Sequence, residues 1–191
     1  MNFCSHCGGP LRRGTPEGDD HLRHICDACG TIHYRNPKII AGCLPVWGEQ
    51  LLLCRRAIEP RKGYWTLPAG FMEEGETLAY AARREALEEA NVVVEIAELF
   101  TLFSLPHLSQ VYVFFRARML DERSEPGAES LETRLFAEAE IPWEELSFET
   151  VYRSLRYFFS DRRQGRFALH NEDIGPFSRR LMGALADRSR G

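Results

Sequence analysis

The sequence lacks the long apolar runs and the strong charge bias that mark membrane-spanning and nucleic-acid-coating proteins. The apolar stretch IIAGCLPVW is interrupted by Gly42 and Pro45 and is far shorter than the roughly 20 residues of a membrane helix. The opening residues, MNFCSHCGGP, contain no apolar core of a secretory signal. The net charge is −4, which provides no excess of basic groups for binding nucleic acid. We therefore expect a cytoplasmic protein with no membrane partner, and a nucleic-acid partner is disfavoured.

Internal repeats and low-complexity segments are also missing, so neither a solenoid nor a disordered chain is predicted. The chain has 191 residues, of which 44% are hydrophobic and 27% are charged. This composition is typical of a globular enzyme or binding domain. The length allows one full domain with a small module, or two small domains, and it is sufficient to bury a core.

Cysteine is present six times, and four of these residues form two Cys-x-x-Cys pairs. Their spacing is that of a site in which four thiolates hold a tetrahedral Zn²⁺. A glycine follows each pair and permits the chain to turn tightly beneath a metal. Two thioredoxin-like redox pairs are the alternative, but the strand and helix context of such motifs is missing. We predict a structural zinc ribbon with the ligands Cys4, Cys7, Cys26 and Cys29.

The ribbon is expected to comprise residues 1–36, which are rich in Gly, Cys, His and charge and cannot build a core alone. His6, His24 and His33 are alternative metal ligands, although hydrogen-bonded or exposed histidines are the favoured interpretation. The two remaining cysteines, Cys43 and Cys54, lie in apolar, strand-like runs and are predicted to be buried thiols.

From residue 37 the pattern changes to strands and helices. KIIAGCLPVW and QLLLCRR flank a Gly-Glu turn, which predicts a hairpin. GYWTLPAGFMEEGE is a loop with one short strand, and a helix follows from Thr77, its expected N-cap, to Ala90. The small side chains of Ala82 and Ala86 recur with Leu78 at helical spacing, so this helix can lie close to a sheet.

Three further strands are predicted at VVVEIAELFTLFSL, SQVYVFFRARML and TRLFAEAEI. Residues 148–163 then read as an amphipathic helix with an apolar face. We place the second domain at residues 37–165. The tail, residues 166–191, is basic and weakly periodic, and both a docked short helix and a frayed end are open for it.

Glu85, Glu88 and Glu89 share one face of the helix predicted to end at Ala90. At about 6 Å, each pair would repel by about 2 to 3 kcal/mol at an effective dielectric constant near 20. A solvated acidic face is one interpretation. The other is a site for a hard divalent cation, Mg²⁺ or Mn²⁺, which prefers oxygen ligands and leaves positions open for phosphate oxygens.

The residues upstream decide between these interpretations. Gly70, five residues, Glu76, seven residues and then REALEEANV resemble the Nudix box, Gly-x5-Glu-x7-Arg-Glu-U-x-Glu-Glu-x-Gly-U, in which U is apolar. One departure is Asn91, which stands in place of the last glycine of the motif, and Ala86 is small for an apolar position. Asparagine is the second-best residue for the left-handed conformation that follows a helix, so we expect the geometry to be retained.

Resemblance to the Nudix hydrolases implies an α/β/α sandwich with a mixed sheet, here preceded by the zinc ribbon. It also implies that water attacks a phosphorus atom of a nucleoside diphosphate derivative. Arg84 would orient a glutamate, and Glu76 would be structural or bind metal through water. The implied ligands of catalytic Mg²⁺ or Mn²⁺ are a backbone carbonyl of Ala69 or Gly70 and the side chains of Glu76, Glu85, Glu88 and Glu89.

The wider sequence is similar to ribbon-bearing Nudix proteins of the FAD/ADP-ribose pyrophosphatase group, through CSHCGGPL, CDACGTIHYRNPKIIAG, GYWTLPAGFMEEGET and PGAESLETRLF. NADH pyrophosphatases, which also remove NAD caps from RNA, carry Ser-Gln-Pro-Trp-Pro-Phe-Pro-x-Ser after the box. This chain reads FTLFSLPHLSQVYVFF there. ADP-ribose or FAD is therefore the expected substrate, with AMP as a product. NADH or NAD-cap hydrolysis and a nucleotide-sensing regulatory protein are the alternatives.

Several side chains outside the box are candidates for substrate contact. Three arginines are placed to bind phosphate: Arg55, Arg56 and Arg61. The alternative is that they are ordinary surface arginines. Trp65 and Tyr64 can stack on a flavin or adenine ring, and a packing role is the alternative for Trp65.

Glu129 and Glu132 lie in a downstream acidic loop, from which the related ADP-ribose hydrolases can bring a glutamate as general base. We assign Glu132 to catalysis and Glu129 to substrate binding. A flexible acidic loop without such a role is the alternative, and the box residue Glu89 is the other candidate for the base. His107 is a further candidate near the site. A homodimer is expected by analogy with Nudix relatives.

Overall fold

The computed structural model describes residues 1–176 and divides into two units, Met1–Pro37 and a larger unit that begins at Lys38. None of the helices among these described residues is both long and apolar enough to span a membrane.

The smaller unit is an antiparallel sheet of three strands in the order β1-β2-β3. Gly8 and Gly30, which follow the two Cys-x-x-Cys pairs, have φ angles of 74° and 72°. The amide of Gly8 donates to the carbonyl of Cys4, and that of Gly30 donates to Cys26. Glycine is needed at both turns because an L side chain disfavours positive φ. The strands are β1 Leu11–Gly14, β2 Arg23–Cys26 and β3 Ile32–His33.

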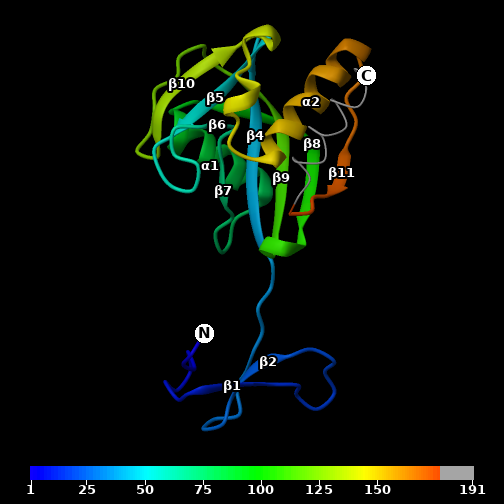
Figure 1. Cartoon of the computed structure of the whole chain (residues 1–191). Coiled ribbons are helices and arrows are strands. Elements are labelled where there is room, and N and C mark those ends of the chain that lie inside the picture. The colour runs from blue at the N-terminus through cyan, green and yellow to red at the C-terminus, as the bar shows by residue number, and fades with distance from the viewer. Residues whose placement is uncertain (177–191) are drawn as a thin grey trace. The chain divides into compact units, whose positions relative to one another are not determined.

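The larger unit is built on one mixed sheet, as predicted (Figure 1). Its main path runs β10-β5-β4-β9-β8-β11, with β6 beside β5 and β7 beside β4. β4 with β9 and β8 with β11 are parallel pairs, and the other pairs are antiparallel. The strands are β4 Lys38–Trp47, β5 Gln50–Arg56, β6 Trp65–Thr66, β7 Ala69–Phe71, β8 Val94–Leu105, β9 Gln110–Met119, β10 Ser130–Phe136 and β11 His170–Asp173.

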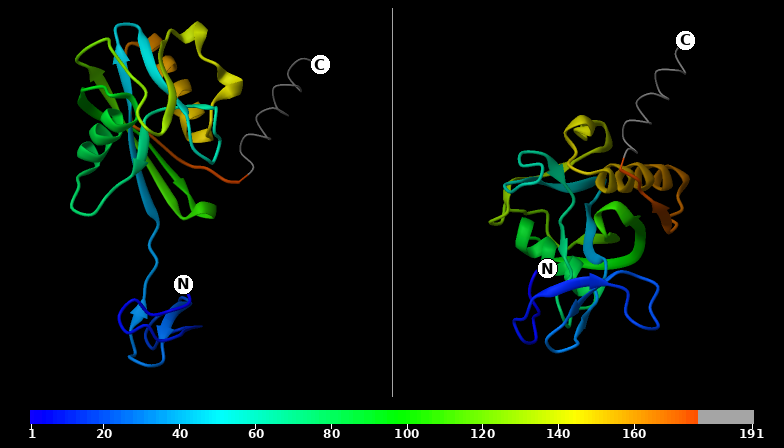
Figure 2. Two further views of the ribbon diagram at one scale, coloured as in Figure 1. Left: turned by 90° about the vertical axis from the view of Figure 1, so that its left-hand side faces the viewer. Right: turned by 60° about the horizontal axis from the view of Figure 1, so that its bottom comes forward.

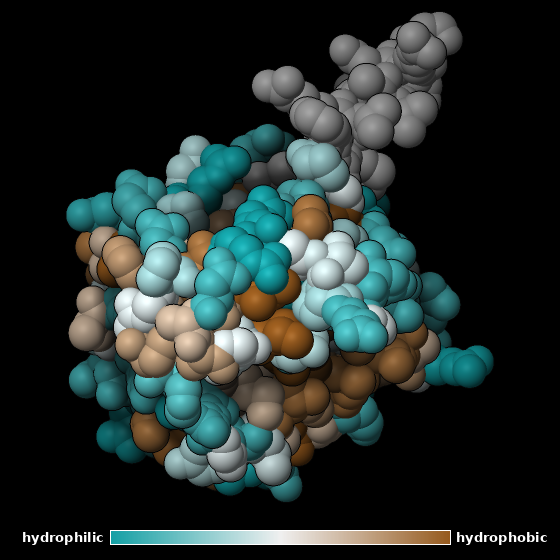
Figure 3. All heavy atoms as spheres, turned by 90° about the horizontal axis from the view of Figure 1, so that it is seen from below, coloured by the Kyte–Doolittle hydropathy of each residue, from teal (hydrophilic) through white to brown (hydrophobic). Residues whose placement is uncertain are grey.

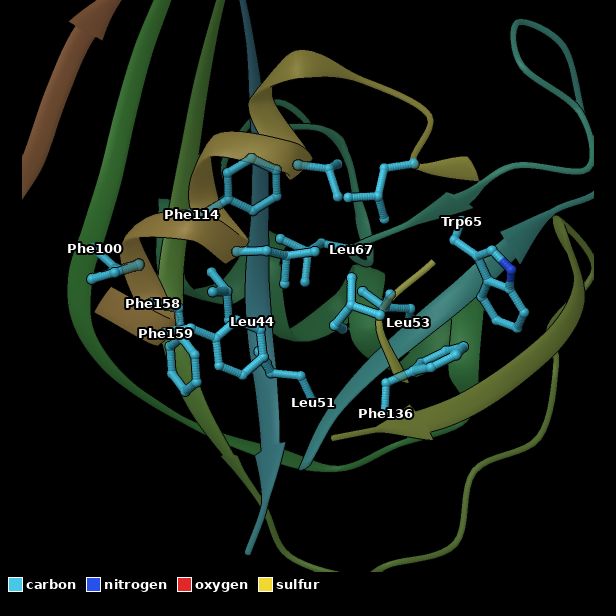
Figure 4. Close-up of a cluster of buried hydrophobic side chains, with 14 of the residues drawn as sticks. Leu44, Leu51, Leu53, Trp65, Leu67, Phe100, Phe114, Phe136, Phe158 and Phe159 are labelled. Atoms are coloured by element: carbon cyan, nitrogen blue, oxygen red, sulfur yellow. The ribbon is translucent and has the colours of Figure 1, made fainter. Parts of the chain in front are cut away.

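One long helix covers each face of this sheet, which makes the α/β/α sandwich (Figure 2). Helix α1, Leu78–Ala90, packs its buried alanines on one face together with Cys43 and Cys54, which are buried thiols as predicted. Helix α2, Glu149–Gln164, buries Phe158 and Phe159 on the other face. That larger core also contains Leu44 of β4, Leu51 and Leu53 of β5 and several phenylalanines (Figure 4).

Two predictions about the second half of the chain are wrong in part. The strand expected at TRLFAEAEI ends at Phe136, and 3-10 helices at Glu138–Glu140 and Trp143–Glu145 follow. The tail contains a strand, β11, which pairs with β8 at the sheet edge, whereas we expected a short helix or a frayed end. The sequence of this strand, HNED, is polar and therefore carries no apolar signal. Backbone pairing and ion pairs hold the strand in place. Residues 177–191 lie outside the described residues.

The short strand β7 reaches β4 only because Gly42 leaves room for it. A Cβ atom at Gly42 would lie 2.4 Å from the Cβ of Ala69 and 2.5 Å from the carbonyl oxygen of Pro68. β7 pairs with the first half of β4, while β5 pairs with its last two residues. This close approach places Ala69 and Gly70 next to β4 in the sheet, where they contact helix α1.

Several apolar side chains of the described residues are exposed. In the face seen from below in Figure 3, brown side chains adjoin one another near the centre and lower right, and teal and white ones surround them. The exposed fractions of Tyr80 and Leu87 on α1 are 56% and 50%. Singly exposed apolar side chains are ordinary on a folded protein.

Candidate active site and zinc site

Helix α1 positions the three glutamates because both of its ends are fixed. At its start, the hydroxyl of Thr77 accepts a hydrogen bond from the amide of Tyr80 at 3.2 Å, so the predicted N-cap is present. At its end, Asn91 has φ 52° and ψ 33°, the left-handed conformation expected of the residue that replaces glycine. The helix therefore ends at Ala90, one residue after Glu89, the last glutamate of the motif.

Arg84 joins the carboxylates of the box into one cluster. Its Nε lies 2.7 Å from Glu76 Oε1, and its Nη1 donates to Glu85 at 2.6 Å and to Glu88 at 2.9 Å. Nη2 donates to the second oxygen of Glu76 and to the carbonyl of Phe71. One planar guanidinium thus orients three glutamates by charge-assisted hydrogen bonds.

The two sheet-facing glutamates, Glu85 and Glu89, are buried, with 8% and 6% of their surface exposed. Burial, together with the charge of Glu85, raises the pKa of Glu89 to about 8. Burial likewise raises the pKa of Glu85 above its usual range, against the effect of Arg84. The amide of Ala69 donates to Glu89 Oε2 at 3.2 Å and fixes that carboxylate. Buried carboxylates that face one another carry a charge that a bound cation would neutralise.

Gly70 leaves open the space in front of Glu85. A Cβ atom at Gly70 would lie 2.3 Å from Glu85 Oε1 and 2.6 Å from Glu85 Oε2. The carbonyls of Ala69 and Gly70 belong to the same short strand, β7, which the sheet holds against α1. Backbone and carboxylate oxygens are the donors that Mg²⁺ and Mn²⁺ prefer, so the residues present fit such an ion.

Glu76 stands apart from the other box glutamates. Both of its oxygens are engaged by Arg84, and one of them also accepts from the amide of Glu73 at 2.9 Å. The interaction with Arg84 lowers the pKa of Glu76. Of the two roles weighed for this residue, the structural one agrees with these contacts.

Among the candidates outside the box, Arg56 and Glu129 act electrostatically on the box glutamates. The charge of Arg56 opposes the rise in the pKa of Glu89, and its guanidinium lies 5.2 Å from the centre of the Phe148 ring. Arg55 turns elsewhere, toward the carbonyl of Gly63 and an ion pair with Glu132 across neighbouring strands. The charge of Glu129 contributes to the raised pKa of both Glu85 and Glu89.

Trp65 is the site candidate that the structure moves into the core. Only 6% of its surface is exposed, and its ring packs edge-on against Phe136 at 4.9 Å (Figure 4). A ring enclosed in this way has no free face for a flavin or adenine. The guanidinium of Arg61 lies 5.1 Å from the ring centre of Tyr64 in the loop after β5, and His107 is exposed in the 3-10 turn Pro106–Leu108.

Sequence reasoning missed two aromatic residues near Arg56. Tyr112 on β9 is half-buried, and the charge of Arg56 lowers its pKa against a larger rise caused by burial. Phe148 precedes α2, and the Arg56 guanidinium lies over its ring. Their only sequence signal is the alternation of apolar residues, which does not distinguish a pocket wall from a core position.

The four cysteines of the ribbon form one cluster, not two separate pairs. Cys4 Sγ lies 3.7 Å from Cys29 Sγ, and Cys7 Sγ lies 3.5 Å from Cys26 Sγ. All four sulfurs are within 4.8 Å of one another. A tetrahedral ion with Zn–S bonds of about 2.3 Å separates its sulfurs by about 3.8 Å, so the cluster fits Zn²⁺. This is the arrangement of a structural zinc site.

The histidines weighed as alternative zinc ligands lie outside this cluster as the structure describes it. Nε2 of His33 lies 3.2 Å from Cys4 Sγ, which is a hydrogen-bond distance to a sulfur. A ring N–H in that position stabilises the thiolate from outside the ligand set.

The fold and the carboxylate cluster together define a class of protein in which a strand-loop-helix segment presents oxygen atoms that suit divalent cations. Comparison with known families agrees with this class. The NUDIX domain model matches residues 36–163, and a model described as Nudix N-terminal, a zinc ribbon, matches residues 2–35. The chain belongs to the Nudix family and is a Nudix hydrolase with an N-terminal zinc ribbon.

Curated relatives carry the name NAD-capped RNA hydrolase NudC. The protein of Photobacterium profundum is 30% identical over 145 residues, which are 74% of this chain and 52% of the relative. That of Vibrio cholerae is 35% identical over 100 residues, which are 49% of this chain and 33% of the relative. The chain thus spans about half the length, or less, of these curated relatives.

Solved structures give a match along nearly the whole chain. A NUDIX hydrolase from Nitrosomonas europaea is 54% identical with a TM-score of 0.90, covering 92% of this chain and 99% of that one. An ADP-ribose pyrophosphatase from Streptococcus suis has a TM-score of 0.57 at 18% identity, covering 71% of this chain and 99% of that one. At that identity the likeness concerns the fold alone.

Proposed function

We propose that the chain hydrolyses the diphosphate linkage of a nucleoside diphosphate derivative, with ADP-ribose or FAD as substrate and AMP as one product. The observation that carries this proposal is the cluster in which Arg84 holds Glu76, Glu85 and Glu88 while Glu89 lies buried beside them. The carbonyls of β7 complete a set of oxygen donors on rigid elements.

Glu85, Glu88 and Glu89, with a carbonyl of Ala69 or Gly70, would hold Mg²⁺ or Mn²⁺. Such an ion, when bound, neutralises the diphosphate and makes water a better nucleophile. Arg84 keeps the carboxylates in place, and the amide of Ala69 keeps Glu89 turned toward the site. Rigid orientation of this kind lowers the cost of reorganisation during the reaction.

The reaction forms one bond from the water oxygen to a phosphorus atom and breaks the bridging phosphorus–oxygen bond. The leaving phosphate retains the electron pair of the broken bond, and the water proton passes to a carboxylate. Glu89 and Glu129 are the candidates for that acceptor, since the charge of Glu129 acts on Glu89. Arg56, whose charge acts on Glu89, is suited to hold a phosphate oxygen of the substrate.

A second candidate is the NADH or NAD-capped RNA class, which is favoured by the name of the curated relatives. Against it, the nicotinamide-type motif is replaced by residues that form the end of β8, a 3-10 turn and β9. The expectation that nucleic acid is not a partner depends on this choice and stays a prediction. The homodimer and the cytoplasmic location are proposals in the same sense.

The test is a panel of ADP-ribose, FAD, NADH, NAD-capped RNA and coenzyme A, each assayed with Mg²⁺ and ranked by kcat/KM. We expect ADP-ribose or FAD to rank first, with AMP released. A clear preference for NADH or capped RNA would replace our substrate assignment with the second candidate. Tight nucleotide binding with no hydrolysis of any compound would instead favour a sensor.

A further inference from the structure

Asn91 has a contact that a helix cap does not need. The left-handed turn requires only its backbone, whose N–H serves the carbonyls of Ala86 and Leu87. Its side-chain amide is free for another use, and Nδ2 donates to the carbonyl of Glu125 at 3.1 Å. Glycine, the residue of the Nudix box at this position, has no side chain to make that bond.

Two backbone hydrogen bonds reinforce the Asn91 contact. The amide of Glu125 donates to the carbonyl of Ala90, and the amide of Gly127 donates to that of Glu89, both at 3.0 Å. These carbonyls belong to the last turn of α1 and would otherwise lack partners within the helix. The part of the acidic loop that precedes β10, residues 121–129, is therefore fastened to the end of the box helix, and the name acidic loop is kept for this part.

Gly127 shows how closely the acidic loop fits this helix end. A Cβ atom at Gly127 would lie 1.7 Å from the carbonyl oxygen of Glu88, an overlap that only a shift of backbone could relieve. At the far end of the loop, the carbonyl of Glu129 accepts from the amide of Ala57 at 2.8 Å. The acidic loop thus bridges the box helix and the segment that follows Arg56.

This bridge brings a further carboxylate to the site. Glu129 is exposed, yet its charge acts on both buried glutamates, Glu85 and Glu89. Like charges repel, so Glu129 stays near them only while the loop is held from both sides. The loop is held to α1 by two hydrogen bonds from backbone amides and by one from the side chain of Asn91.

We propose that Asn91 is a positioning residue that holds the acidic loop on α1 and thereby keeps Glu129 within reach of the reacting centre formed by Glu85 and Glu89. The inference rests on the hydrolytic function proposed above. In this role, Asn91 acts through Glu129 and does not itself touch the substrate.

Asn91→Gly is the decisive substitution because it retains the left-handed cap and removes only the side-chain donor. We expect kcat to fall by about 10-fold or more, as for loss of a partner that orients a ligand, with KM almost unchanged. The melting temperature should change little, because glycine is favoured at this cap. Asn91→Asp, which keeps the shape but places an acceptor opposite the Glu125 carbonyl, should reproduce the loss of kcat.

A double-mutant cycle separates positioning from a general effect on stability. Glu129→Gln should also lower kcat, and adding Asn91→Gly to it should cost nothing more, because both changes remove the same contribution. Gly127→Ala displaces the acidic loop in a different way and should also lower kcat. In a protein that already carries Glu129→Gln, Gly127→Ala should lower kcat no further.

Full kcat in Asn91→Gly would overturn the proposal, as would losses that multiply in the double mutant. A fall in melting temperature that accounts for the lost activity would reduce Asn91 to a cap. These outcomes are distinct from failure of the proposed function. If the wild-type protein hydrolyses no compound of the panel, the hydrolytic assignment fails and this inference fails with it.

Discussion

At the scale of single residues, Arg84 organises the site because one guanidinium contacts three carboxylates and a backbone carbonyl. Without it, Glu85 and Glu88 would repel each other and turn apart. Lysine could not substitute, since a point charge on a flexible stem does not match two carboxylates in a fixed plane.

Glu88 offers the cleanest test of the carboxylate cluster. Its side chain is 57% exposed, so Glu88→Gln should leave the fold and the melting temperature intact. We expect kcat to fall by about 100-fold or more, because even the loss of an outer-shell partner costs about 10- to 100-fold. Glu98→Gln, an exposed glutamate on β8, serves as the matched control and should retain full activity. Unchanged turnover in Glu88→Gln would refute the assigned metal ligands.

At the scale of elements, the site is a junction between the short strand β7 and helix α1. Gly42 leaves room for β7 in the sheet, and the alanines of α1 let the helix pack close to the sheet. The glutamates of the helix then lie near the carbonyls of Ala69 and Gly70. Each element is unremarkable by itself. The cluster exists because small residues at two positions let both elements approach closely.

Gly70→Ala tests this junction. The added Cβ would lie 2.3 Å from Glu85 Oε1, so the glutamate or the strand must move. We expect kcat/KM to fall by about 100-fold, the cost of misplacing a reacting group by about 1 Å. Gly175→Ala is the control, because a Cβ there meets nothing within 4 Å. The measurement is steady-state kinetics at saturating Mg²⁺, and equal activity in the two variants would contradict the predicted crowding.

Thr77→Ala tests the other end of α1. It removes the hydrogen bond to the amide of Tyr80 and should lower the free energy of unfolding by about 1 kcal/mol. Thr77→Ser, which retains the hydroxyl, should lose much less. Urea unfolding of both variants measures the difference, and equal losses would show that the cap contributes nothing.

At the scale of the whole molecule, the ribbon and the larger unit follow different folding principles. The larger unit buries phenylalanines and leucines on both sides of a mixed sheet. The ribbon has little apolar surface to bury, and it depends on the bonds of four thiolates to one ion. A homodimer is predicted as well, and light scattering of the full chain measures it.

The zinc assignment predicts about one zinc per purified chain, bound by the four cysteines. Cys7→Ser should lower that content sharply, because a serine hydroxyl is a poor ligand for this ion. Cys54→Ser is the control, since that thiol lies in the core of the larger unit. Mass spectrometry of the metal content distinguishes the two, and a zinc-free wild-type protein would refute the site.

The sequence by itself determined the elements whose signals are local. Thr77 and Asn91 bound the box helix because capping depends on adjacent residues. The two Cys-x-x-Cys pairs indicated a metal site because ligand spacing is local to each turn. The alternation of apolar residues predicted most strands, and the spacing of the box glutamates indicated a cation site.

Only the tertiary structure decided what depends on long-range contact. It enclosed Trp65 in the core, added the polar strand β11 to the sheet edge, and paired Glu132 with Arg55 instead of the site. It also gave the side chain of Asn91 a partner 34 residues away in the acidic loop. No pattern in neighbouring residues records such contacts, because they arise when separate elements pack together.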